Sequence, residues 1–443
     1  MLKAVFDKAY EAGAAVKVAD AVFPAPFASG LEYGAPARGV WNIVHTGMLI
    51  PGAHQIFVCA QQCLRGVVLT AAEMNAAYRF STIAIEEHNV IAGDMEQLII
   101  DGVRDILNRM SALPPLVLLY TSCIHHFMGC DLQYVFRRLK EDNPAVSFVD
   151  CYMDPIMRKS GLTPDQKMRL QLYAILDPVE RHDEAINYIG NDLSIDQSSD
   201  ITQLIRKSGK KIRDITTCET YEEYLDMAKS RMNITFHPAA KAAGEDLERR
   251  LGQKHMYLPQ CFCYDEIDGN LALLAQYLDL PEPDTGTLRH KAEKSLQEAG
   301  AIIGNASIAI DYTAVTRPLG LARLLLEHGF NVTSVYADSF CMEERDDFRW
   351  LQKNRPELKL FTTVHHEMRV LPRKHETEAL AIGQKAAYFT GCENFVNIVE
   401  GGGMYGYDGI CRLCGLMIDA YLNPKNIQDN IRIKGLGCGG CCL

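Results

Sequence analysis

The 443-residue sequence has no long apolar run and no block of basic residues. Its longest apolar stretches, such as residues 116–120, fall far short of the roughly 20 residues needed to span a membrane. The net charge of −11 argues against general binding to nucleic acid. The first residues are charged and lack the apolar core of a signal peptide. We therefore expect a cytoplasmic protein with no membrane or nucleic-acid partner.

The sequence also lacks low-complexity tracts and fixed-period repeats, and its length predicts two to four domains. Short apolar segments typical of buried parallel strands alternate with charged, helical ones. The predicted strands are residues 116–121, 145–150, 187–190, 233–236, 256–258, 307–311, 331–336, 358–363, 386–389 and 395–399. This pattern predicts an α/β protein with three Rossmann-like, doubly wound parallel-sheet domains around a central cleft. The expected boundaries are 1–183, 184–283 and 284–443.

Cysteine is abundant, with 15 residues, and two of them stand at the junction of an apolar strand and a helix. These are Cys59 and Cys123, which the carboxyl ends of two strands would present outward. Reduced thiols at such positions favour an iron–sulfur cluster over a disulfide, although a single buried cysteine is more often a core residue. Cys63, one helical turn beyond Cys59, and Cys130 are candidates for additional ligands.

Two thiolates are too few for a cubane cluster, which takes about four. If two chains meet about a two-fold axis at this edge, two cysteines from each supply the set. Two further groups have metal-ligand spacing and are candidates for a second site. They are Cys411 with Cys414, and the terminal Cys438, Cys441 and Cys442. Core packing is the alternative for the first group, and a maturation site or a redox-sensitive tail is the alternative for the second.

A glycine run at residues 401–403 lies between a predicted strand and a helix. Such a loop lets backbone amides approach a ligand, and the following helix N-terminus favours a negative group. We predict that Gly402, Gly403 and Tyr405, together with His237, border a substrate or cofactor pocket. As a dinucleotide fingerprint the run has the wrong spacing.

Several blocks of the sequence, in order, resemble the motifs of the nitrogenase component 1 family, whose relatives include the dark-operative protochlorophyllide and chlorophyllide reductases. They are residues 29–41, 56–59, 121–131, 310–318 and 403–409. The resemblance implies an oxidoreductase that receives low-potential electrons from an ATP-dependent iron–sulfur reductase and acts on a small molecule. It also implies a homodimer, or a heterotetramer with a paralogue, that shares a 4Fe–4S cluster between subunits.

The sequence departs from the family pattern at positions that hold metal clusters in nitrogenase. Leu31 stands where the first cysteine of the eight-iron cluster would be, which favours a four-iron cluster on Cys59 and Cys123. His237 and Tyr405 stand where nitrogenase holds its molybdenum–iron cofactor by a cysteine and a histidine. We therefore expect no dinitrogen reduction, and any second metal cofactor in the cleft would be held differently. His237 precedes Pro238 and has a simpler alternative role as a helix cap.

Two other functions stay open at this point. The family includes scaffolds on which a metal cofactor is assembled and then transferred, and the cysteine-rich tail suits such a carrier. A redox-inactive protein that binds a tetrapyrrole or another metal complex is the third reading. No residue of the sequence indicates which substrate the protein would take.

Overall fold

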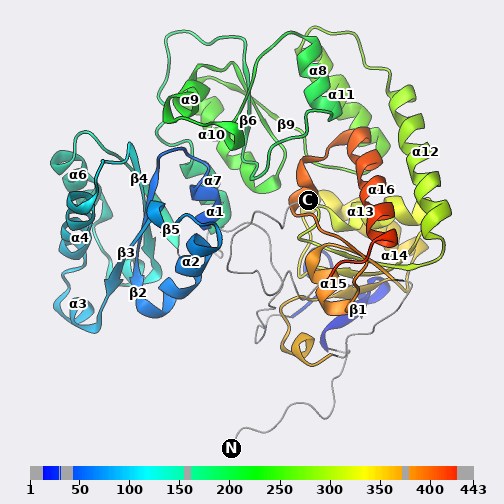
Figure 1. Cartoon of the computed structure of the whole chain (residues 1–443), viewed down its shortest axis with the longest axis horizontal. Helices are drawn as coiled ribbons and strands as arrows, with labels where there is room; N and C mark the ends of the chain where they lie inside the picture. The colour runs from blue at the N-terminus through cyan, green and yellow to red at the C-terminus, as the bar shows by residue number, and fades with distance from the viewer. Residues whose placement is uncertain (1–12, 29, 31–42, 154–160, 372–378, 427–443) are drawn as a thin grey trace, which may run out of the picture.

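The computed structural model describes residues 13–28, 30, 43–153, 161–371 and 379–426. It contains three sheets, each in its own lobe of the molecule: the first on the left of Figure 1, the second at the top and the third on the right. All strand pairs are parallel except the one made by the first strand. The predicted α/β fold with several parallel-sheet domains is confirmed.

The first sheet is buried on both faces. Its strand order is β3 (Phe80–Ile85), β2 (His54–Ala60), β4 (Leu116–Ser122) and β5 (Ser147–Met153). Alternate residues of β2 enter two different cores, Phe57 and Cys59 on one side and Ile56 and Val58 on the other. Burial on both faces explains the continuous apolar run of β4, since no position of it meets water. The helices are α1 (Ile43–Gly47), α2 (Gln61–Glu73), α3 (Glu87–Ala92), α4 (Met95–Arg109), α5 (Cys123–Met128), α6 (Leu132–Asp142) and α7 (Pro164–Gln171).

The second sheet is smaller and repeats the same winding. Its order is β7 (Ile212–Asp214), β6 (Ile186–Ile189), β8 (Met232–Thr235) and β9 (Lys254–Tyr257). Its helices are α8 (Asp200–Lys207), α9 (Tyr221–Leu225), α10 (Lys241–Leu251) and α11 (Tyr264–Tyr277). In both sheets the chain first adds a strand on one side and then continues on the other. The winding therefore reverses between β2 and β4, and again between β6 and β8, where α/β proteins bind ligands.

The third sheet has six strands. Their order is β1 (Ala15–Lys17), β12 (Lys359–Phe361), β11 (Asn331–Tyr336), β10 (Ser307–Asp311), β13 (Leu380–Ile382) and β14 (Phe395–Val396). The helices are α12 (Thr285–Ile303), α13 (Pro318–Glu327), α14 (Arg345–Asn354), α15 (Gln384–Thr390) and α16 (Gly406–Leu422). β1 pairs antiparallel with β12, so residues 15–17 lie in the third sheet although they precede the first in sequence (Figure 1).

One predicted strand is wrong. Residues 386–389 form part of α15, and the strand of this region is the shorter β13, just before it. The segment is apolar because the helix is buried on all sides, and such a short apolar run does not reveal its period. The boundaries at 183 and 283 fall between the sheets, apart from β1, and remain a prediction.

None of the helices in the described ranges is long and apolar enough to cross a lipid bilayer.

Candidate functional site

Cys59 and Cys123 lie at the first point where the winding reverses. Cys59 is the penultimate residue of β2, and Cys123 is the first residue of α5, directly after β4. The two strands pair in parallel, and their last paired residues are Val58 and Thr121. Neighbouring parallel strands end at the same edge of a sheet, so both cysteines stand at one edge. The structure thus brings together the two cysteines that the sequence singles out.

The thiol of Cys59 is held in its protonated form. Burial, followed by the charges of Cys63 and Cys123, raises its pKa to about 12. The charges of Cys63 and Cys123 both act on Cys59, and Cys63 itself is exposed on α2. A bound metal lowers the cost of such a thiolate, because its positive charge favours the deprotonated ligand. Two thiols at one strand edge therefore fit the donor set of an iron–sulfur cluster.

Cys130 lies apart from this pair. It packs with the core on the other face of the sheet, and burial, followed by the charge of Glu96, raises its pKa to about 11. Cys411 and Cys414 lie on α16, where Cys414 is part of the core between the second and third domains. Cys438, Cys441, Cys442 and Leu31 lie outside the described residues.

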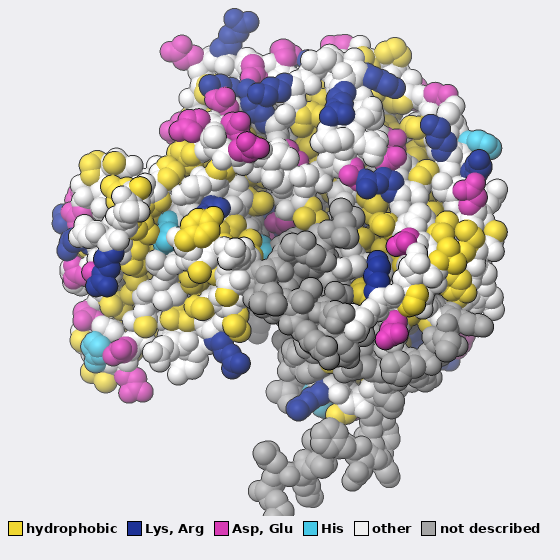
Figure 2. Space-filling view, in the orientation of Figure 1, with side chains coloured by type: hydrophobic (Ala, Val, Ile, Leu, Met, Phe, Trp, Pro, Cys, Tyr) yellow, Lys and Arg dark blue, Asp and Glu magenta, His cyan; other side chains and the backbone are white. Residues whose placement is uncertain are grey.

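No single described region of the chain completes a metal site. Among the residues that the structure describes, no three His, Cys, Asp or Glu side chains gather where they could hold a metal ion. The helices that follow the two cysteine-bearing strands instead expose apolar side chains. These are Val68 and Leu69 on α2, and Phe127 and Met128 on α5. Figure 2 shows hydrophobic side chains on the face of the first domain that carries α2.

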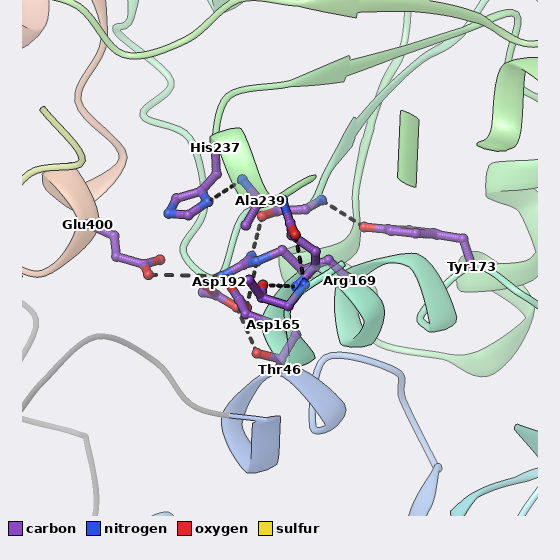
Figure 3. Close-up of polar contacts among 11 residues, drawn as sticks. Thr46, Asp165, Arg169, Tyr173, Asp192, His237, Ala239 and Glu400 are labelled. Carbon is purple, nitrogen blue, oxygen red and sulfur yellow. Dashed lines mark hydrogen bonds and ion pairs between the residues drawn. The ribbon is translucent and has the colours of Figure 1, made fainter. Parts of the chain in front are cut away.

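A second polar centre lies where the three domains meet, around Arg169 (Figure 3). The side chain of Arg169 is 1% exposed and that of Asp192 is 2% exposed. Arg169 Nη2 lies 2.6 Å from Asp192 Oδ2, and its Nε lies 3.0 Å from Asp165 Oδ1. Arg169 also donates to the carbonyl of Gly190. A buried guanidinium requires such partners, since an unpaired buried charge is costly.

The members of this centre come from distant parts of the chain. Arg169 and Asp165 lie on α7, and Asp192 lies in the loop after β6. Thr46 of α1 donates its hydroxyl to Asp192 Oδ1 over 3.3 Å. Glu400 begins the short helix η10 (Glu400–Gly403) of the third domain and extends toward Asp192 in Figure 3. We call Asp165, Arg169, Asp192, His237 and Glu400 the junction cluster.

Two carboxyl groups of the junction cluster are in contact. The carboxyl groups of Glu400 and Asp192 lie within hydrogen-bond reach of each other, and Glu400 Oε1 lies 3.9 Å from Arg169 Nη2. Burial alone would raise the pKa of Asp192, but the charge of Arg169 and the hydrogen bonds from its neighbours together lower that pKa. For Glu400, burial and the negative charge of Asp192 raise the pKa well above its ordinary value. The pKa values of the two carboxyl groups are therefore shifted in opposite directions.

His237 follows β8 and borders the same centre. Its Nδ1 accepts the backbone N–H of Ala239 over 3.1 Å, so it caps the short helix η7 (Pro238–Ala240), as the simpler alternative expected. Burial and the charge of Arg169 lower its pKa to about 4, which leaves the imidazole neutral at pH 7. Tyr405 packs its ring against Phe236, with centroids 4.6 Å apart, and is buried.

The glycine loop serves close packing between domains. A Cβ on Gly401 would lie 2.2 Å from Gln260 Nε2, and one on Gly403 would lie 2.2 Å from the carbonyl oxygen of Ser194. Of these three glycines only Gly402 is partly exposed, and the atom nearest to a Cβ added there would be 3.6 Å away. The negative group expected at the following helix is part of the chain, because Asp200 accepts the N–H of Tyr407 over 2.7 Å. The N-terminus of α16 is thus already occupied.

The junction cluster contains carboxylates and one imidazole, and no cysteine among its described members. It does not fit a cofactor held by a cysteine and a histidine. Its carboxyl groups can instead hold and transfer protons. Sequence reasoning found His237 but missed Asp165, Arg169, Asp192 and Glu400. Asp192 and Glu400 had a signal, since both lie in the loop after a strand, β6 and β14, whereas Arg169 resembles any charged residue of a polar helix.

Comparisons with known proteins agree with this architecture. The family described as nitrogenase component 1 type oxidoreductase matches residues 44–414. A structure of nitrogenase Cp1 at pH 6.5 aligns with a TM-score of 0.64 and 14% identity, over 89% of this chain and 95% of that one. Another, of nitrogenase Cp1 at pH 5, gives 0.57 and 12%, over 93% and 94%. No curated protein sequence matches significantly. At these identities the structures show the fold, whereas the family match covers most of the sequence. The chain is therefore a member of the nitrogenase component 1 type oxidoreductases.

Proposed function

We propose that this protein is the catalytic component of a nitrogenase-like reductase. In this proposal Cys59 and Cys123 of two chains hold one 4Fe–4S cluster between them. The chains form a homodimer, or pair with a paralogue within a heterotetramer. The partner is an ATP-dependent iron–sulfur reductase, and the substrate is a small molecule other than dinitrogen, reduced in the cytoplasm.

The observation that carries this proposal is the position of the two cysteines at adjacent strand ends, where the winding of the first sheet reverses. Soft thiolate ligands suit an iron–sulfur cluster. One chain offers two such donors at this edge, and about four are needed. A second chain related by a two-fold axis would present the same pair.

The surface beside the cysteines supports a contact between chains. Phe127 follows Cys123 by one helical turn and is 70% exposed, and Leu69 on α2 is 50% exposed. Exposed apolar side chains that gather around a site are typical of a surface that another chain covers. The same contact would shield the cluster from water.

A bound cluster would supply one-electron transfer at low potential. The residues of the chain would hold this cluster and order the turn around it. Cys59 and Cys123 hold the metal as thiolates, and His125 fixes the helix that begins at Cys123. The Nδ1 of His125 accepts the N–H of Ser122 over 3.1 Å, which orders the turn between β4 and α5. The junction cluster lies where the three domains meet and is the proposed place for the substrate.

Oxygen-free purification with iron and sulfide counting tests the proposal. We expect about four irons and four sulfides per two chains in the wild-type protein. Cys59→Ala and Cys123→Ala should lose most of this metal. Cys151→Ala is the matched control, because Cys151 is equally buried in the same sheet but lies within β5. It should keep the metal.

Equal iron in Cys59→Ala and Cys151→Ala would refute the bridging cluster. Electron transfer then separates the remaining functions. A reductase should accept electrons from its ATP-hydrolysing partner and turn over repeatedly. An assembly scaffold should instead release an intact cofactor to an acceptor protein, and a redox-inactive binding protein should contain no iron.

A further inference from the structure

The carboxyl groups of Asp192 and Glu400 lie against the same guanidinium nitrogen of Arg169, within hydrogen-bond reach of each other, and the proposed cluster does not use them. They come from different domains and meet inside the molecule, where the side chain of Glu400 is 10% exposed. Two ionised carboxylates in hydrogen-bond contact would repel each other strongly in such a place. One proton shared by the pair removes this repulsion and provides the donor of their hydrogen bond.

The geometry decides which partner holds the proton. Arg169 lies 2.6 Å from Asp192 but 3.9 Å from Glu400, and Thr46 also donates to Asp192. Both contacts stabilise negative charge on Asp192. Within the described residues, the backbone N–H of Glu400 donates to the carbonyl of Thr313, so it is not turned to its own carboxyl group. The negative charge therefore resides on Asp192 and the proton on Glu400.

We propose that Glu400 is a carboxylic acid at neutral pH and donates its proton to a ligand bound between the three domains. This inference rests on the proposed reductase function for its chemistry. It adds a group for the delivery of protons, which a reduction consumes together with electrons.

The step is balanced as follows. The substrate takes up two electrons, one at a time, from the low-potential iron–sulfur donor, and two protons, and becomes its dihydro product. The O–H bond of Glu400 breaks and its proton goes to the substrate atom that gains the electron pair. The second proton comes from solvent. Glu400 is then left as a carboxylate beside Asp192 and takes a proton back from water, so the pair returns to its starting state.

The groups around Glu400 favour this cycle. The charged groups that face it are Asp192 from the second domain and Arg169 with Asp165 from α7. Tyr405, whose pKa is raised by burial, and the neutral His237 complete the surroundings. The side chain of Asp165 is 45% exposed, which gives the junction cluster a route to solvent. One arginine faces three carboxyl groups here, so a proton on one of them leaves a single excess negative charge.

The net charge of the protein shows whether Glu400 holds a proton, and this charge can be measured without knowing the substrate. The full-length protein is compared by capillary electrophoresis at pH 7 with Glu400→Gln. We expect equal mobility, because glutamine replaces a group that is already neutral. The exposed Glu282 provides the matched control, and Glu282→Gln should lose one negative charge. The double variant Glu400→Gln/Asp192→Asn should also lose one, because Asp192 is the charged partner.

A loss of one charge in Glu400→Gln, or none in the double variant, would overturn the proposal. If Glu400→Gln fails to fold, Asp192→Asn gives the same information. Its mobility should be unchanged, because Glu400 then ionises beside Arg169, and a loss of one charge would refute the shared proton. Iron content reports on the cluster separately. A normal charge count with no iron would refute the reductase function and leave the proton on Glu400 in place.

Discussion

Arg169 and Asp192 form an ion pair of 2.6 Å in which both side chains are almost completely buried. Arg169 belongs to the helix after the first sheet, and Asp192 belongs to the second sheet's first loop. The pair therefore joins two domains at the point where the third contributes Glu400. Several measurable consequences depend on this centre and on the cysteine edge.

Removal of the buried arginine should destabilise the protein strongly. Arg169→Met leaves Asp192 buried without its counter-charge, and we expect a loss of about 3–5 kcal/mol in the free energy of unfolding. Arg104→Met is the control, because Arg104 forms exposed ion pairs with Asp101 and Asp142. That change should cost about 0–1 kcal/mol. Urea unfolding of both variants measures the difference, and equal midpoints would contradict the structural role of Arg169.

The pH dependence of stability should reveal Glu400. Its pKa is raised in the folded protein above about 4.3, the ordinary value in the unfolded chain. The stability that Glu400 contributes is then complete below about pH 4.3 and is lost as the pH rises toward the folded pKa. The free energy of unfolding of the wild type, relative to Glu400→Gln, should fall by up to about 1.4 kcal/mol per pH unit in this range. Asp192, whose pKa is lowered, acts in the opposite direction and loses its contribution as the pH falls. Parallel curves for wild type and variant would contradict the raised pKa of Glu400.

Thiol alkylation should distinguish the cysteines of the metal-free protein. Cys63 is exposed on α2 and should react first with iodoacetamide at pH 8. Cys59 is buried with a pKa of about 12, so only about one molecule in ten thousand carries its thiolate at this pH. Mass spectrometry of the peptides gives the order of reaction, and Cys151 is the buried control. Labelling of Cys59 as fast as Cys63 would show that this edge opens in solution.

The glycine loop should tolerate substitution unequally. Gly402 and Gly403 both have positive φ angles, 57° and 76°, so alanine is strained at either position. A Cβ at Gly403 would also meet the carbonyl of Ser194, whereas one at Gly402 meets nothing closer than 3.6 Å. Gly403→Ala should therefore lose about 1–3 kcal/mol more than Gly402→Ala. Thermal unfolding compares the two, and a larger loss in Gly402→Ala would contradict the packing between loop and second domain.

A charge on the exposed surface of α5 should weaken the proposed dimer. Phe127→Glu places a carboxylate beside the cysteine edge, and we expect dimer dissociation to rise at least about tenfold, roughly 1.4 kcal/mol. Iron content should fall with it. Ile91→Glu is the control, since Ile91 is exposed on α3, outside this surface. Sedimentation velocity measures both variants, and an unchanged dimer in Phe127→Glu would place the contact elsewhere.

Sequence periodicity was sufficient for most of the strands. Those at residues 116–121, 307–311 and 331–336 were placed within a residue or two, because buried parallel strands have continuous apolar runs. It failed at residues 386–389, where a buried helix has the same composition as a strand. It also did not assign residues 15–17 to the third sheet, because the partner of β1 lies more than 300 residues away. Pairing between such distant segments leaves no local pattern.

The cysteine edge and the junction cluster also differ in how far the sequence predicts them. A cysteine at the end of each of two apolar strands is predictable from the sequence alone, since strand and cysteine belong to one short segment. That those two strands are neighbours, and that Arg169, Asp192 and Glu400 meet, follows from the folded arrangement of the domains. An isolated charge on a polar segment has no preference that identifies its partner. Burial at the junction of three domains gives each of these charges its partner, because there an unpaired charge would be too costly to keep.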